Sequence, residues 1–274
     1  MIASIARTAV LAIGLWSAAS AGAGRAEVVQ EVVDLQVRPG VMQRMLVLTP
    51  DRPDASVLLF TGGEGRVEID DAGEIRSGGN FLVRTRGRWA GWRFLTFVVD
   101  APSDRHGPAG LGAYRLESGH AQDIAATIRY ARERAKVPVW LIGTSRGTIS
   151  AAHGAARIAE DRPDGLVLTS SILRANKSRG SPVGDEVFDV DLASIRMPVL
   201  IVHHREDACQ VTPFDAVASL AEKLVNAKPV GILAYEGGLP PRSAPCEARA
   251  QHGYFGLEER VVEDIARWIK AQGR

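Results

Sequence analysis

The chain has 274 residues, of which 46% are hydrophobic and 24% are charged, and its formal net charge is +1. These values are ordinary for a packed globular protein, and the length fits one large α/β domain. Acidic and basic residues are balanced and form no long run of one sign, which argues against a nucleic-acid-binding surface and against a polybasic membrane patch.

Residues 1–26 differ from the rest of the chain. Arg7 precedes the apolar and small-residue stretch TAVLAIGLWSAAS, and residues 21–23 (AGA) and 24–26 (GRA) offer small-x-small cleavage sites. This pattern is typical of a secretory signal peptide, since its apolar core is too short to span a bilayer comfortably. An uncleaved N-terminal anchor is the alternative. We expect a mature chain without a membrane span, exported to the periplasm or the medium of a bacterium.

Strand-like and helix-like segments alternate along the rest of the chain, after a predicted hairpin of residues 31–37 and 42–50. Near-continuous apolar strands that alternate with helices form a parallel sheet covered on both faces. The pattern therefore predicts one α/β domain over residues 27–274 with eight strands. Its remaining strands are expected at 56–63, 94–100, 137–143, 165–172, 197–204 and 229–238, and its main helices at 117–135, 148–160, 212–226 and 257–271.

The polar segments 64–93 and 173–196 are too short to form separate domains, so we expect a minimal cap. The first should hold one helix near residues 80–91. Its aromatic and basic side chains could form a cationic rim around a site, but we favour tryptophans packed on the sheet with arginines outward. The residues concerned are Phe81, Arg86, Arg88, Trp89 and Trp92.

The segment GTSRG, residues 143–147, lies between a predicted buried strand and a predicted helix. A G-x-S-x-G pattern alone is a weak signal, but this position is where a sharp turn exposes a nucleophilic serine. Gly143 and Gly147 would remove side chains that collide at the turn, and Ser145 Oγ would enter the cleft. The N-terminal amides of the following helix favour a developing negative charge, so the Arg146 N–H is the expected first oxyanion donor.

A serine hydroxyl needs a base, and the base needs an acid that orients it. His252 is the histidine, of six, that follows the last predicted strand in the loop before the last helix. In the chain order serine, acid, histidine, this is where the base belongs, although a plain surface histidine is the alternative. Glu206 and Asp207 follow strand 197–204, and either could be the acid or merely a solvated carboxylate.

The segment HHRED, residues 203–207, could also be a set of metal ligands. Adjacent residues of a strand point to opposite faces of the sheet, so His203 and His204 would not converge on one ion. We therefore expect no metal, and the proposed chemistry needs no organic cofactor.

Two further features concern the loops around these residues. Cys209 and Cys246 lie beside the acid and base loops, and two cysteines in an exported chain suggest one disulfide rather than two free thiols. Such a bridge would tie the two loops together. The glycines that end strand 56–63 let the backbone approach a substrate, so Gly63 N–H is the expected second oxyanion donor, with Glu64 N–H as competitor and a plain turn as the alternative.

At this point the sequence resembles the α/β-hydrolase family over residues 30–271. The resemblance rests on VWLIGTSRGT, PVLIVHHREDACQVTP and QHGYFG. It implies a catalytic triad with two oxyanion donors, namely Ser145, Asp207 and His252 with Gly63 and Arg146. Thr61 stands where many members have histidine, and His204 where many have glycine. The nearly absent cap removes the usual guide to the substrate.

The predicted activity is that of a serine hydrolase acting on a small-molecule carboxylic ester through an acyl-enzyme. A peptidase or amidase would use the same triad, and so would a thioesterase, for which acyl-CoA is scarce outside the cytoplasm. A non-catalytic binding protein on the same fold is the alternative from another class.

Overall fold

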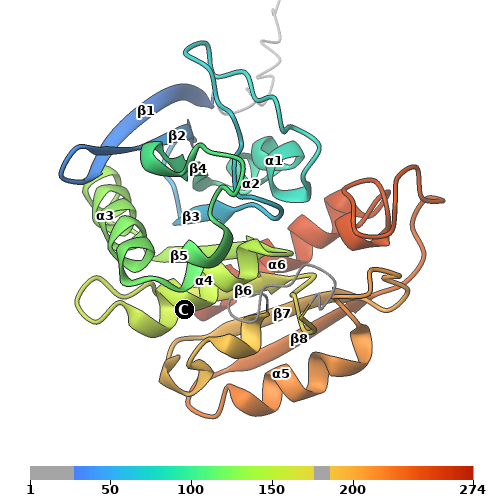
Figure 1. Ribbon diagram of the computed structural model, residues 1–274. Helices are drawn as coiled ribbons and strands as arrows, with labels where there is room; N and C mark the ends of the chain where they lie inside the picture. The colour runs from blue at the N-terminus through green and yellow to red at the C-terminus, as the bar shows by residue number, and fades with distance from the viewer. Residues whose placement is uncertain (1–27, 176–185, 274) are drawn as a thin grey trace, which may run out of the picture.

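The computed structural model describes residues 28–175 and 186–273, so the predicted signal peptide lies outside the described residues. Eight strands form one sheet in the order β1-β2-β4-β3-β5-β6-β7-β8 (Figure 1). β2 pairs antiparallel with β1 and β4, and every other neighbouring pair is parallel. The predicted mostly parallel sheet is confirmed. The strands are β1 Val29–Arg38, β2 Val41–Thr49, β3 Ala55–Phe60, β4 Phe94–Pro102, β5 Val139–Thr144, β6 Gly165–Thr169, β7 Val199–His204 and β8 Val230–Tyr235.

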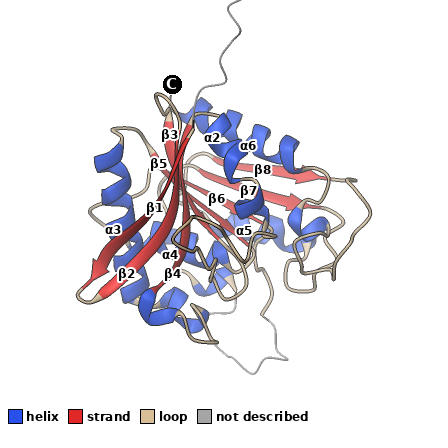
Figure 2. Cartoon of the chain, turned by 90° about the horizontal axis from the view of Figure 1, so that it is seen from above, coloured by secondary structure: helices blue, strands red, loops and turns tan. Residues whose placement is uncertain are grey.

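Helices cover both faces of this sheet (Figure 2). One face packs against α3, α4 and α5, and the other against α1, α2 and α6. Strands β3 to β7 are buried along their whole length, which explains why they are continuous apolar runs. The helices are α1 Phe81–Arg84, α2 Arg86–Gly91, α3 Ser118–Arg134, α4 Gly147–Arg157, α5 Val217–Lys223 and α6 Glu258–Gln272.

The helix predicted near residues 80–91 is two short helices that meet at Thr85. The Asn80 side chain caps α1 by accepting from Leu82 N, and Thr85 Oγ1 donates to the Phe81 carbonyl where α1 ends. Trp89 is fully buried and Arg88 is exposed, as the favoured packing requires, whereas Trp92 and Arg86 are both half-buried. Within the part of the chain that the structure describes, no helix has both the length and the apolar character to cross a membrane.

The sheet topology brings several loops to one edge. Parallel strands end at the same side, and the loops after β3, β5, β6 and β7 all leave the sheet there. Ligand sites of such sheets lie outside these carboxyl ends. The predicted triad and oxyanion residues other than His252 follow three of these strands, namely β3, β5 and β7, whereas His252 and Cys246 lie in the segment after β8.

Candidate active site

The turn between β5 and α4 is held in an unusual backbone conformation. Ser145 has φ +53°, in the left-handed region that a residue with a side chain rarely adopts. A Cβ on Gly143 would overlap the Gly147 carbonyl across the turn, and a Cβ on Gly147 would overlap the Phe60 carbonyl of β3. The two glycines are therefore required for different reasons. Gly143 allows the sharp turn, and Gly147 lets the turn lie against the neighbouring strand.

The loop after β3, residues 61–65, lies directly against this serine. A Cβ on Gly62 would approach Ser145 Cβ to 2.8 Å and Ser145 Oγ to 3.3 Å, so the backbone at Gly62 is in contact with the nucleophile candidate. The Gly62 carbonyl accepts from Gly65 N at 3.1 Å. Gly63 has φ +56°, a left-handed conformation that glycine adopts without strain.

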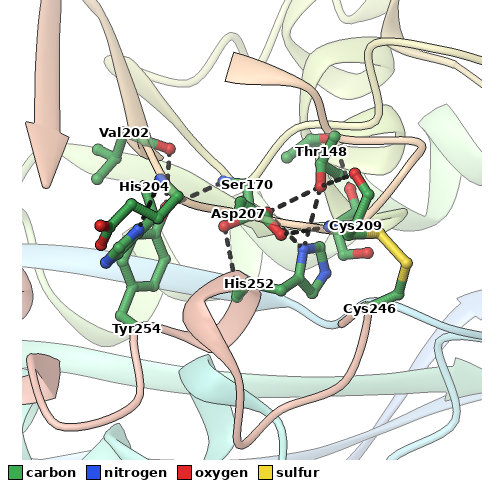
Figure 3. A network of polar contacts seen from close by, with 12 residues as sticks. Thr148, Ser170, Val202, His204, Asp207, Cys209, Cys246, His252 and Tyr254 are labelled. Carbon is green, nitrogen blue, oxygen red and sulfur yellow. Dashed lines mark hydrogen bonds and ion pairs between the residues drawn. A yellow bond between two sulfur atoms is a disulfide. The ribbon is translucent and has the colours of Figure 1, made fainter. Parts of the chain in front are cut away.

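Asp207 and His252 are in contact although 45 residues separate them in the chain. His252 Nδ1 lies 2.9 Å from Asp207 Oδ2, and the Asp207 side chain is fully buried (Figure 3). Asp207 Oδ1 accepts from Cys209 N at 2.9 Å, and Oδ2 also accepts from Thr212 Oγ1 at 2.8 Å. Each carboxylate oxygen therefore has a donor that fixes its direction, and Oδ2 faces the imidazole.

Glu206, the competing acid, is placed elsewhere. Its Oε2 accepts from Gly237 N at 2.9 Å, and the residue is exposed. The neighbouring His204 turns the same way, with Nε2 3.0 Å from the Gly237 carbonyl. Of the two carboxylates in this loop, Asp207 is the one that contacts His252.

His203 points to the other face from His204 and packs its ring against Phe214. Burial lowers the pKa of His203 to about 4, so its imidazole is neutral at neutral pH. Among residues 28–175 and 186–273, no group of three or more His, Cys, Asp or Glu side chains is arranged to hold a metal ion.

Residues that sequence reasoning did not single out hold the His252 loop. Ser170 Oγ donates to the His252 carbonyl at 2.8 Å, and Ser170 N donates to Tyr254 Oη at 3.1 Å. Tyr254 Oη donates in turn to the Val202 carbonyl at 2.8 Å (Figure 3). Tyr254 is itself in the left-handed region, with φ +56°. The loop that carries the base candidate is thus anchored to the ends of β6 and β7.

The two cysteines are joined in one disulfide, Cys209–Cys246, which closes a segment of 37 residues. Cys209 lies two residues after Asp207 and donates its N–H to that carboxylate, while Cys246 lies six residues before His252. The bridge therefore ties the acid loop to the base loop beside the Asp207–His252 contact.

Removing the bridge is expected to loosen this contact as well as the fold. Closing a loop of 37 residues lowers the entropy of the unfolded chain, and the loop-entropy relation gives about 4 kcal/mol. A Cys209→Ala/Cys246→Ala variant should lose roughly this amount in urea unfolding. Alkylation of the unreduced, denatured mature chain should add no label, and reductant should release two thiols. The double variant is the control, because adding reductant should not change its unfolding. Two reactive thiols in the unreduced wild-type chain would contradict the bridge.

A small cavity of about 70 Å³ joins the nucleophile and base candidates. It opens between the loop after β3, the β5–α4 turn, the start of α1 and the loop that carries the base. Its volume leaves little space next to the serine, although most of the side chains that line it are small. Residues that line it include Gly62, Gly63, Phe81, Ser145, Cys246 and His252.

No family profile and no curated protein sequence matches the chain. Solved structures do match it. A protein described as a predicted CIB-like hydrolase from Thermoplasma acidophilum has a TM-score of 0.58 and 14% identity, with 89% of this chain and 100% of that chain covered. An esterase from Pyrococcus furiosus has a TM-score of 0.60 and 13% identity, covering 89% and 91%. A thermostable carboxyl esterase from Bacillus coagulans, in complex with glycerol, has a TM-score of 0.60 and 13% identity, covering 88% and 98%.

These likenesses establish the fold. The eight-stranded, mostly parallel sheet with helices on both faces is the α/β-hydrolase fold, as the sequence resemblance implied. At such low identity the likeness says nothing by itself about the reaction, because one fold carries many functions. The reaction depends on the residues that the fold brings together at the site.

Proposed function

We propose that the protein is a serine hydrolase that cleaves small-molecule carboxylic esters, with Ser145, Asp207 and His252 as its catalytic triad. One observation carries the proposal. His252 contacts the buried Asp207 at 2.9 Å and shares a cavity with Ser145, which lies on a strained strand-to-helix turn. Nucleophile, base and orienting acid come from three separate loops, and a chance meeting of all three at one sheet edge is improbable.

The position of Asp207 determines which ring nitrogen of the neutral His252 carries the hydrogen. The Asp207 carboxylate can only accept, so His252 Nδ1 carries the hydrogen that it donates to Oδ2. His252 Nε2 is then the nitrogen with a free lone pair, and it can take the proton of Ser145 Oγ as that oxygen attacks the ester carbonyl. The imidazolium that forms is stabilised by Asp207.

The rest of the cycle follows from that proton transfer. The tetrahedral intermediate expels the alcohol, which receives the proton from His252 Nε2, and an acyl-enzyme remains on Ser145 Oγ. His252 then takes a proton from water, the hydroxide attacks the acyl carbonyl, and the acid leaves as Ser145 recovers its proton. No step requires a metal or an organic cofactor.

The oxyanion donors in this proposal are the N–H groups of Gly63 and Arg146. The Gly62 carbonyl is turned inward to Gly65 N. In a trans peptide the N–H points opposite to the carbonyl, so the Gly63 N–H points out of the loop. Arg146 follows the serine at the start of α4, where backbone amides and the helix dipole both favour an anion. Glu64 N–H remains the competing donor.

Several observations support the finer parts of the proposal. Proteins described as esterases are among the solved structures that share the fold, which agrees with the choice of an ester as substrate. The disulfide fits an oxidising compartment and thus agrees with the signal-peptide pattern of residues 1–26. We therefore place the enzyme in the periplasm or outside the cell, as a single domain from residue 27 with a minimal cap.

A fluorophosphonate probe tests the proposed function directly. Such a probe reacts with serines whose hydroxyl has been activated by a base, so peptide mapping should find the label on Ser145 of the native protein and no label after heat denaturation. A native chain that resists the probe would be a non-catalytic binding protein. Hydrolysis of p-nitroacetanilide that matched or exceeded that of p-nitrophenyl acetate would make it an amidase.

A further inference from the structure

Arg115 is fully buried next to the proposed oxyanion loop. It lies in the 3₁₀ helix Gly112–Leu116, between β4 and α3. Its Nη1 donates to Ser150 Oγ at 2.5 Å, and its Nη2 donates to the carbonyls of Gly63 at 3.0 Å and Thr61 at 3.4 Å. All three acceptors are neutral oxygens.

The charge of Arg115 is retained in this setting. Burial lowers its pKa to about 9, and the positive charge of Arg146 acts in the same direction, whereas Glu64 acts against it. The guanidinium is therefore still cationic at neutral pH. His120 beside it is neutral, because burial, foremost, and the charge of Arg115 hold the pKa of His120 well below its usual range. A buried cation that is hydrogen-bonded to neutral oxygens is costly to fold, and such groups concentrate at functional sites.

Arg115 holds the two peptides that flank the one carrying Gly63 N–H, and a turn within the loop holds that middle peptide. Its Nη2 holds the carbonyls of Thr61 and Gly63, and the carbonyl between them, that of Gly62, is held by Gly65 N. Gly65 also makes room for the guanidinium: with φ +74°, its position would bring a Cβ to 2.9 Å from Arg115 Nη2. Three consecutive peptide planes of the loop are thereby set.

The same guanidinium reaches the helix that begins at the nucleophile turn. Ser150, which accepts from Nη1, is a fully buried residue of α4, five positions after Ser145. Arg115 therefore bridges the loop that presents Gly63 N–H and the helix that presents Arg146 N–H. The guanidinium is planar and its two Nη atoms have a fixed spacing, a property that the single ammonium group of lysine lacks.

We propose that Arg115 is a positioning residue that holds the two oxyanion donors, Gly63 N–H and Arg146 N–H, at a fixed separation and adds the field of a buried positive charge to theirs. The proposal rests on the serine hydrolase function proposed above. Preorganised donors act on the charge that develops in the transition state and not on the neutral ester. Arg115 should therefore act on kcat and leave KM nearly unchanged.

Three variants of the full mature chain test this role with p-nitrophenyl acetate, and a fourth serves as their control. Arg115→Met keeps the bulk but removes the charge and all three bonds, and kcat should fall about 100-fold with KM within about twofold. Arg115→Lys keeps a charge without the planar fork and should be intermediate. Ser150→Ala cuts only the link to α4 and should give a smaller fall. Inhibition by a trifluoromethyl ketone, which forms an oxyanion on the enzyme, should weaken in the same order.

Tyr114→Phe is the matched structural control. It lies beside Arg115 in the same 3₁₀ helix and loses a buried bond to Asp123 Oδ2, so its melting temperature should fall while its kcat should not. The proposal is overturned if a folded Arg115→Met keeps kcat within threefold, or if Tyr114→Phe loses kcat equally. Should Arg115→Met fail to fold, unchanged kcat in both Arg115→Lys and Ser150→Ala overturns it. Wild-type protein that neither hydrolyses the ester nor reacts with a fluorophosphonate overturns the proposed function itself, and this inference with it.

Discussion

Replacing Ser145 with alanine is expected to lower kcat for p-nitrophenyl acetate by about 10⁵- to 10⁶-fold, because the variant lacks the hydroxyl that forms the acyl-enzyme. The residual rate should come from direct attack of water on the ester, with the oxyanion donors still stabilising the intermediate. Alanine and serine are similarly disfavoured at a φ of +53°, so the substitution should leave the turn and the melting temperature nearly unchanged. Steady-state kinetics and thermal unfolding of the variant measure both.

The control for this variant is Ser194→Ala. Ser194 is an exposed serine outside the β5–α4 turn, and its Oγ donates to the nearby Asp191. The kcat of the Ser194→Ala variant should equal that of the wild type. Unchanged turnover in the Ser145 variant would show that the esterase activity of the preparation does not arise at this serine, and the proposed mechanism would be wrong.

Exchanging Asp207 for asparagine should lower kcat by about 10⁴-fold through the tautomer of His252. Cys209 N donates to Oδ1, so the oxygen of the new amide would stay there and its NH₂ group would take the place of Oδ2. That NH₂ would face His252 Nδ1, which would then have to accept. The hydrogen of the neutral imidazole would move to Nε2, the nitrogen that must take the proton of Ser145.

Glu206→Gln is the matched comparison for Asp207→Asn. Both changes replace a carboxylate by its isosteric amide in the same loop, and they differ in what the carboxylate contacts. Glu206 bonds the backbone of Gly237 and not the imidazole, so kcat should stay within about twofold of the wild type. A large loss in Glu206→Gln with a small loss in Asp207→Asn would exchange the two assignments.

Much of the fold was predictable because its signals are local. Strands β3, β5 and β7 are near-continuous apolar runs, and α6 has its apolar residues at helical spacing, so the alternation of such segments predicts the parallel sheet. The junction at Ser145 is readable for the same reason: the strand, the glycines and the helix are contiguous. The helix near residues 80–91 was wrong as one element because its apolar pattern continues through Thr85, where the backbone actually leaves the first helix.

The residues that sequence reasoning missed are those whose role depends on distant partners. Tyr254 Oη reaches the Val202 carbonyl across 52 residues, and Arg115 reaches Thr61 across 54. Nothing next to either residue in the sequence distinguishes it from an ordinary buried tyrosine or a surface arginine. Thr212, which donates to Asp207, is likewise one of many threonines until β7 and the following loop are folded.

The contact between Gly62 and Ser145 also limits how the protein can vary over evolution. Position 62 has no chemical group to contribute, yet even the methyl of alanine would meet the Ser145 side chain at 2.8 Å. A saturation mutagenesis library selected for activity should therefore be depleted of every substitution at 62, as it should at 143 and 147. Among homologues, glycine at this position should persist longer than most residues of the hydrophobic core. A core side chain can be exchanged for another of similar volume, whereas glycine is the one residue without the Cβ that would collide with Ser145.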